Sequence, residues 1–365
     1  MPPEHRHTPD RLHRRLVPAV ALLLLAPWAA ECSWGGFTLA DTPFVVLVLA
    51  PMYGGAALLI RETARRLGLG WPAIALLAAA FGVVQAGLVD QSLFNPGFLD
   101  DTEFADTRAA AEATLVPGLG FSARQAFDYV GNHVVLSICA PIAIVESYLG
   151  AHRRPRPWLG RPGLAVVALL YLAGSLLVFA DDGGRKNFLA SPVQLTAAAG
   201  VAVALIAAAV LTRRRPAPSV VVPPQRPRPA PATAAPQQTD GEAYERRAPH
   251  PLWPAVVVLL AYACAGLLPG WPGVAVGLAL AATAATVLVV WSRRAGWGQR
   301  HVLAAGTASL LVAAAQAYLV PTYAPATPAA ALAGDVAVSV MAVTFVGGAA
   351  WRLRRPSPTV HVRAS

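Results

Sequence analysis

The sequence has few charged residues. Asp, Glu, Lys and Arg make up 13% of its 365 residues, while 56% of them are hydrophobic. An ordinary soluble domain carries roughly 25% charged residues, so this chain has too little polar surface to cover a water-soluble fold. The scarcity of charge excludes an ordinary soluble protein and indicates a protein embedded in a lipid bilayer.

Cysteines and catalytic motifs are also scarce. The three cysteines, Cys32, Cys139 and Cys264, are scattered without C-x-x-C spacing, which argues against a disulfide framework or a zinc site. The sequence contains no H-E-x-x-H, G-x-S-x-G or Walker motif and no basic–aromatic pattern typical of nucleic-acid binding. We therefore expect no metal, no cofactor and no nucleic-acid partner, and the balance favours a protein that is not an enzyme.

Long hydrophobic segments are abundant. A helix needs about 20 apolar residues to cross the hydrocarbon layer, because lipid cannot form hydrogen bonds with exposed backbone groups. Ten segments meet this requirement: 16–34, 43–60, 71–89, 130–149, 163–180, 193–212, 252–269, 273–292, 302–320 and 329–350. The sequence therefore predicts an all-α, polytopic bundle of about ten transmembrane helices.

The first segment has an alternative interpretation. Arg11, Arg14 and Arg15 precede the apolar run 16–30, as they would in a signal peptide. Residues 27–30 offer no A-x-A-like cleavage site, however. A retained helix is therefore favoured over a cleaved signal.

Basic residues are divided unequally between the two sides that ten helices create. One side holds 25 Lys and Arg residues and the other side holds 4. The basic-rich side comprises residues 1–15, 61–70, 152–162, 213–250, 293–300 and 352–365. Because basic loops stay in the cytoplasm, both termini are predicted to be cytoplasmic, with the protein in the cell membrane.

The segment 216–250 divides the chain. It holds nine prolines and a single aromatic residue, so it cannot bury enough surface to fold and is predicted to be a disordered cytoplasmic linker. Its P-x-x-P pattern could bind a protein partner. The predicted parts are a tail (1–15), a six-helix membrane region (16–215), the linker, a four-helix membrane region (251–352) and a second tail (353–365).

The longest external loop, 91–128, is acidic. Its run from Asp100 to Asp106 holds four carboxylates but has no EF-hand pattern, and so a solvated acidic loop is favoured over a calcium site. Residues 107–115 could form a short interfacial helix.

Strongly polar side chains at membrane depth are costly, and each is therefore a candidate functional residue. Nearly all of them lie in the first six segments, which places any site in residues 16–180. The candidates are Arg61, Glu62, Gln85, Asp90, Asn132, His133 and Glu146, while Glu31 lies at the outer end of the first segment.

His133 and Glu146 lie on the same predicted helix but cannot bind one ion together. Their separation in sequence places them about 20 Å apart, on roughly opposite faces. Ser137 shares the His133 face. His133 is interpreted as a hydrogen-bonded histidine near the outer interface, with a proton-handling or ligand role as the alternative. Glu146 could reach the interface or pair with Arg61 or Arg153.

The other candidates also have structural interpretations. Arg61-Glu62 is interpreted as an interfacial anchor and its partner. Gln85 could join two helices by a hydrogen bond or line a polar cavity, and the first role is the more common. The small residues Gly54-Gly55 allow another helix to approach closely, and no Lys-Ser/Thr follows them as it would in a phosphate-binding loop.

The first 150 residues also carry a set of short motifs. They are Tyr53-Gly54-Gly55, Ile60-Arg61-Glu62, Gly70-Trp71-Pro72, Gly87-Leu88-Val89, Ser92-Leu93-Phe94-Asn95-Pro96, Asn132-His133, Ser137-Ile138 and the run 141–146. Together they resemble a family of uncharacterised bacterial and archaeal membrane proteins, which has no known activity. The resemblance implies a Glu-Glu pair at the position of Gln85-Ala86, loosely similar to that of CAAX-protease-like intramembrane metalloenzymes. In this chain both of those carboxylates are missing.

Three functions are compatible with these patterns. A secondary transporter or permease for a small molecule or ion comes first, because polar residues confined to one half of ten helices suit a substrate path. An intramembrane, CAAX-protease-like enzyme would place His133 beside Glu62 or Glu146. A non-catalytic membrane scaffold would use the linker 216–250 as its working part.

Overall fold

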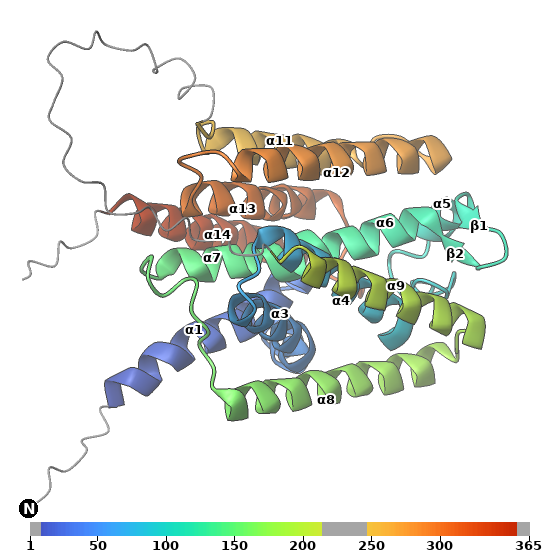
Figure 1. The fold of residues 1–365 in the computed structure, drawn as a ribbon. Coiled ribbons are helices and arrows are strands. Elements are labelled where there is room, and N and C mark those ends of the chain that lie inside the picture. Colours follow the sequence, from blue (N-terminus) through green and yellow to red (C-terminus); the bar gives the residue numbers. More distant parts are fainter. Residues whose placement is uncertain (1–8, 214–246, 356–365) are drawn as a thin grey trace, which may run out of the picture.

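The computed structural model describes residues 9–213 and 247–355. The predicted linker 216–250 and the two predicted tails lie mostly outside these residues. In the described part, the chain folds into helices that run back and forth along one bundle (Figure 1). In the first half these are α1 (Pro9–Pro27), η1 (Trp28–Cys32), α2 (Thr42–Leu49), η2 (Ala50–Gly54), α3 (Gly55–Arg66), α4 (Trp71–Val84), η3 (Gln85–Val89), α5 (Thr107–Glu112), α6 (Ala123–Asn132), η4 (His133–Cys139), α7 (Ala140–Tyr148), α8 (Arg161–Lys186) and α9 (Pro192–Leu211).

The second half contributes five further elements. They are α11 (Leu252–Cys264), α12 (Gly270–Ser292), α13 (Gln299–Gln316), the 3₁₀ turn η5 (Ala317–Leu319) and α14 (Pro328–Arg354). It packs directly on the first half, because α13 and α14 both contact α7. Gly306 permits this contact, since a Cβ there would lie 2.9 Å from the Cβ of Ala143.

The fold is the predicted all-α polytopic bundle. Among the described residues, nine helical segments are long and apolar enough to cross a bilayer: Arg15–Cys32, Thr42–Arg66, Trp71–Val89, Ala123–Tyr148, Arg161–Asp181, Pro192–Leu211, Gly270–Ser292, Gln299–Leu319 and Pro328–Arg354. The tenth predicted span, α11, has 13 residues. At 1.5 Å per residue it is about 20 Å long, which is shorter than a hydrocarbon layer of about 30 Å.

Local sequence explains where several spans begin. Trp71-Pro72 opens α4 with a proline in the first turn, where its missing N–H costs nothing. Ser191 caps α9 through a capping box with Gln194. The Ser122 hydroxyl accepts a hydrogen bond from the Gln125 N–H and so starts α6.

The fourth span is longer than predicted, and this moves His133. The segment was expected to begin at residue 130, with His133 near its outer end, but the helix begins at Ala123. The prediction missed this first part because Arg124 and Asp128 interrupt the apolar pattern, and they pair with each other across one helical turn. His133 therefore lies about 15 Å inside the helix rather than near the interface.

The loop between η3 and α6 lies at one end of the bundle, and the loop between α7 and α8 lies at the other (Figure 1). The predicted interfacial helix exists as α5, and it is followed by a small antiparallel hairpin, β1 (Leu115–Val116) with β2 (Phe121–Ser122), which the sequence pattern did not indicate. Asp100 and Glu112 both pair with Arg108, and Asp101 pairs with Lys186. The acidic run is thus a surface loop with ion pairs, as predicted.

Candidate functional site

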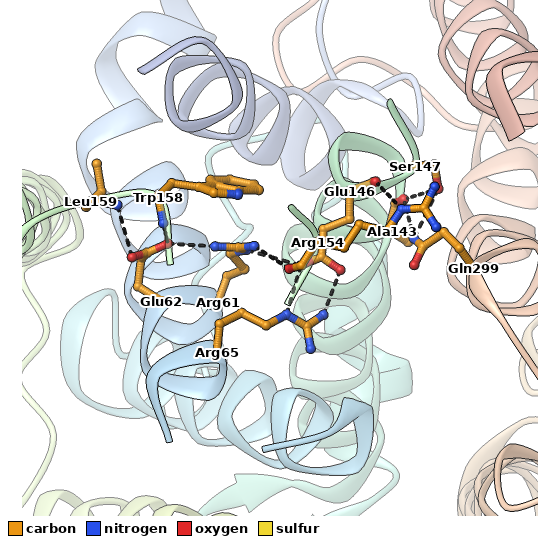
Figure 2. Close-up of polar contacts among 10 residues, drawn as sticks. All are labelled: Arg61, Glu62, Arg65, Ala143, Glu146, Ser147, Arg154, Trp158, Leu159 and Gln299. Atoms are coloured by element: carbon orange, nitrogen blue, oxygen red, sulfur yellow. Dashed lines mark hydrogen bonds and ion pairs between the residues drawn. The ribbon is translucent and has the colours of Figure 1, made fainter. Parts of the chain in front are cut away.

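The predicted candidate residues separate into three places in the fold. Arg61, Glu62 and Glu146 come together where α3 meets α7 (Figure 2). Gln85, Asp90 and His133 belong to a second group, at the π-helical segments of the spans. Asn132 stands apart from both, because its side-chain oxygen accepts a hydrogen bond of 2.8 Å from the Tyr262 hydroxyl of α11.

Arg61 is the centre of the first group, which we call the inner network: Arg61, Glu62, Arg65, Glu146, Arg154 and Trp158. Its Nε donates to Glu146 (3.1 Å), and one terminal nitrogen donates to Glu62 (2.7 Å). The other terminal nitrogen donates to the backbone oxygen of Arg154 (2.7 Å). The guanidinium plane lies 3.6 Å from the centre of the Trp158 ring. The cation therefore has an acceptor at each of its three nitrogens and an aromatic ring against one face.

The two carboxylates of the inner network are equally well bonded. Glu146 accepts both Nε (2.9 Å) and a terminal nitrogen (2.6 Å) of Arg65. Glu62 accepts the backbone N–H groups of Trp158 (2.8 Å) and Leu159 (3.2 Å). These bonds attach the loop between α7 and α8 to α3, as Figure 2 shows.

Burial decides what the inner network can do. Arg61, Glu62 and Glu146 are completely buried, so the prediction of an interfacial anchor at Arg61-Glu62 is wrong. The anchor was inferred from a helix ending at residue 60, whereas α3 continues to Arg66 and the loop covers the pair. In that loop, burial lowers the pKa of the Arg154 guanidinium. Because the bonding capacity of the charged groups is used within the protein, the network is a structural clamp.

The second group coincides with irregular helix geometry. Within the described residues, four spans contain a π-helical segment: η1, η2, η3 and η4. These segments carry Glu31, Tyr53, Gln85 and His133, respectively. A π-turn inserts an extra residue into a helix, is intrinsically rare and is frequently found at functional sites.

Tyr53 connects Glu31 and His133 between the spans. The Tyr53 hydroxyl donates to Glu31. The ring centre of His133 lies 5.7 Å from that of Tyr53 and 5.3 Å from that of Phe81. The Nδ1 of His133 lies 3.1 Å from the Ser137 hydroxyl, as their spacing predicts. We call the group Glu31, Tyr53, Gln85, Asp90, Tyr129, His133 and Ser137 the π cluster.

Gln85 and Asp90 form the outer part of the π cluster. The Nε2 of Gln85 donates to Asp90 (3.3 Å), and the Ser92 N–H donates to the other Asp90 oxygen (2.8 Å). Gln85 therefore bonds within its own span, and the predicted hydrogen bond between two helices is not found. Tyr129 of α6 packs against the buried apolar cluster that includes Val83, Ala86 and Leu93, which lie on either side of Gln85 and Asp90 in the sequence.

Aromatic rings from three loops pack on one another. The ring centres of Trp34, Phe104 and Tyr323 lie 5.2 to 5.8 Å from one another. Trp34 closely follows η1, the segment that carries Glu31, so this aromatic group lies next to that end of the π cluster.

Sequence reasoning missed two members of the π cluster and undervalued a third. Tyr53 and Tyr129 read as ordinary aromatic residues of membrane helices, and Glu31 reads as a residue at a helix end. The only available signal is at Glu31 and Tyr129, which lie within two turns of a polar loop, whereas Tyr53 lies about three turns inside its span.

Comparison of the chain with protein-family models, curated proteins and solved structures finds no match. The resemblance of its motifs to an uncharacterised family therefore stays a prediction.

Proposed function

We propose that this integral membrane protein is a secondary transporter or permease, and that the π cluster lies on the path of its substrate or coupling ion. The observation that carries the proposal is the position of carboxylate, hydroxyl, amide and imidazole groups on the π-helical segments of four spans. Three of these segments are in contact, because the Tyr53 hydroxyl of η2 donates to Glu31 of η1 and the Tyr53 ring packs on His133 of η4. Polar side chains at membrane depth are rare and mark ion or substrate pathways. Transporter sites are commonly built where membrane helices depart from regular geometry.

The distribution of the other polar residues supports a transporter over an enzyme. An intramembrane enzyme of the predicted type would use His133 together with Glu62 or Glu146. These residues lie in two separate groups, about 20 Å apart along the fourth span, and both carboxylates already bind arginine side chains. Because the two groups are separate, we interpret the π cluster as a polar site and the inner network as a structural clamp, rather than both as one catalytic centre.

The test is the accessibility of the π cluster to water from each side of the membrane. Gln85→Cys and Ser137→Cys would be made singly in a chain without Cys32, Cys139 and Cys264, and treated with a membrane-impermeant thiol reagent in vesicles of both orientations. Alternating access predicts that each position is labelled from both sides. Leu169→Cys is the matched control, because Leu169 is an exposed residue on the outer face of α8 and should meet lipid only.

Two outcomes contradict the proposal. The first is protection of both positions from both sides, in protein whose elution in detergent shows it to be folded. The second is labelling from a single side only, under all conditions. The first result would mean that the π cluster is a set of packing residues. The second would mean that it is a site open to one compartment only.

A further inference from the structure

Two oxygen atoms in the π cluster are buried without a hydrogen-bond partner. The Oε1 of Gln85 is one of them, and this side chain is only 2% exposed. The hydroxyl of Tyr129 is the other. A buried polar atom with no partner is costly, and such atoms commonly mark a position where a water molecule or an ion binds.

Both oxygens belong to neighbouring elements. Gln85 donates to Asp90 through its Nε2, and Tyr129 packs against the buried cluster that contains Ala86 and Leu93, on either side of Asp90 in the sequence. Gln85 and Tyr129 come from different spans that contact each other, through η3 and α6. Two contacting elements near Asp90 therefore each present an oxygen without a hydrogen-bond partner.

The backbone holds this carboxylate in a fixed position. The Asp90 N–H donates to the Gln85 carbonyl (3.0 Å), and its side chain accepts the Ser92 N–H. Gln91, the next residue, has a φ of 57°, which is uncommon for a residue other than glycine. Its side chain accepts a bond of 2.7 Å from the Ala190 N–H, and this bond stabilises the turn.

The chemistry of these groups selects the ligand. A carboxylate, an amide carbonyl and a hydroxyl are hard oxygen ligands, which bind hard cations. A monovalent cation would neutralise the single carboxylate of Asp90, whereas a divalent cation would leave an uncompensated charge in a medium of low dielectric constant. A bare proton would neutralise Asp90 but could not satisfy two further acceptors.

We infer that Asp90, Gln85 and Tyr129 form a binding site for a monovalent inorganic cation, with Na⁺ as the probe. The ion is coordinated by oxygen atoms of the Asp90 carboxylate, the Gln85 amide (Oε1) and the Tyr129 hydroxyl. The inference rests on the proposed function only where it gives the ion a role in coupling; binding itself does not require transport.

Thermal unfolding of the full-length protein in detergent tests the site. A ligand that binds only the folded state raises the melting temperature in a concentration-dependent way. NaCl should raise it above the value in choline chloride of equal ionic strength. Asp90→Asn and Tyr129→Phe should each remove most of this Na⁺-specific shift. Asp100→Asn, which changes a carboxylate on the external loop, should retain the full shift.

Several results would overturn the inference. They are an equal effect of sodium and choline salts, a full Na⁺ shift in Asp90→Asn, or a response to pH alone that identifies the ligand as a proton. If Asp90→Asn does not fold, Tyr129→Phe gives the same readout, because it removes one oxygen and keeps the charge. A Na⁺ shift without two-sided labelling at positions 85 and 137 would confirm the ion site and reject the transporter.

Discussion

A single guanidinium, that of Arg61, joins three segments of the chain. It bonds Glu62 on its own helix, Glu146 on α7 and the backbone of the loop at Arg154. A buried ion pair gains little over apolar packing, but removing one partner leaves an uncompensated charge. Arginine suits this position better than lysine, because its planar fork donates in several fixed directions while its face stacks on Trp158.

Replacement of Arg61 should therefore destabilise the protein strongly. We expect Arg61→Ala to lower the free energy of unfolding by about 3–5 kcal/mol, since two buried carboxylates lose their shared partner. Arg61→Lys should lower the free energy of unfolding by less than Arg61→Ala does, because lysine keeps the positive charge but lacks the planar guanidinium that donates in several fixed directions. Arg108→Ala is the control, as Arg108 also pairs with two carboxylates but at the surface. Equal losses of stability in Arg61→Ala and Arg108→Ala, measured by denaturant unfolding in detergent micelles, would contradict this account.

The sequence predicts the helices well and the site only in part. All ten predicted segments coincide with helices, because an apolar run can satisfy its backbone in lipid only by forming one. The π-turns cannot be predicted, because Gln85 and His133 lie in apolar runs that look the same in either helix type. The pairing of Glu146 with Arg61, one of the two arginines expected as its partner, is confirmed. The choice between the two arginines is fixed only by the fold, because Arg61 and Glu146 are 85 residues apart.

Close contact between helices depends on glycine at the η2 segment. A Cβ at Gly54 would lie 2.1 Å from the carbonyl oxygen of Leu23 on α1 and 2.6 Å from its Cα. Both are backbone atoms, so no side-chain rotation could relieve the clash. The small residues of the Tyr53-Gly54-Gly55 run thus allow close approach, as predicted, and they bring Tyr53 within reach of Glu31.

The matched pair Gly54→Ala and Gly200→Ala tests this contact. Gly54→Ala should separate η2 from α1 and destabilise the protein by about 1–3 kcal/mol, the usual cost of overpacking. Gly200 lies within α9, with no atom within 4 Å of the position of an added Cβ. Its replacement should be neutral or stabilise by up to about 1 kcal/mol, because alanine favours a helix more than glycine does. Comparable melting temperatures for the two variants would show that η2 and α1 tolerate separation.

In the described part of the chain, two loops of opposite charge lie at opposite ends of the bundle. The acidic loop between η3 and α6, with α5, lies at one end, and the loop between α7 and α8 lies at the other (Figure 1). The latter loop carries Arg153, Arg154 and Arg156. Because basic loops remain cytoplasmic, this end of the bundle, with the inner network, is predicted to face the cytoplasm, and the π cluster lies nearer the outside.

Two alanine positions test that orientation with the same substitution. Ala110 on α5 and Ala151 in the loop between α7 and α8 are both exposed, so Ala110→Cys and Ala151→Cys in a chain without the native cysteines should leave the fold unchanged. On intact cells, an impermeant thiol reagent should label position 110 but not position 151, and permeabilised cells should label both. The reverse pattern would invert the topology. Labelling of both positions on intact cells would mean that the span between them, Ala123–Tyr148, does not cross the membrane.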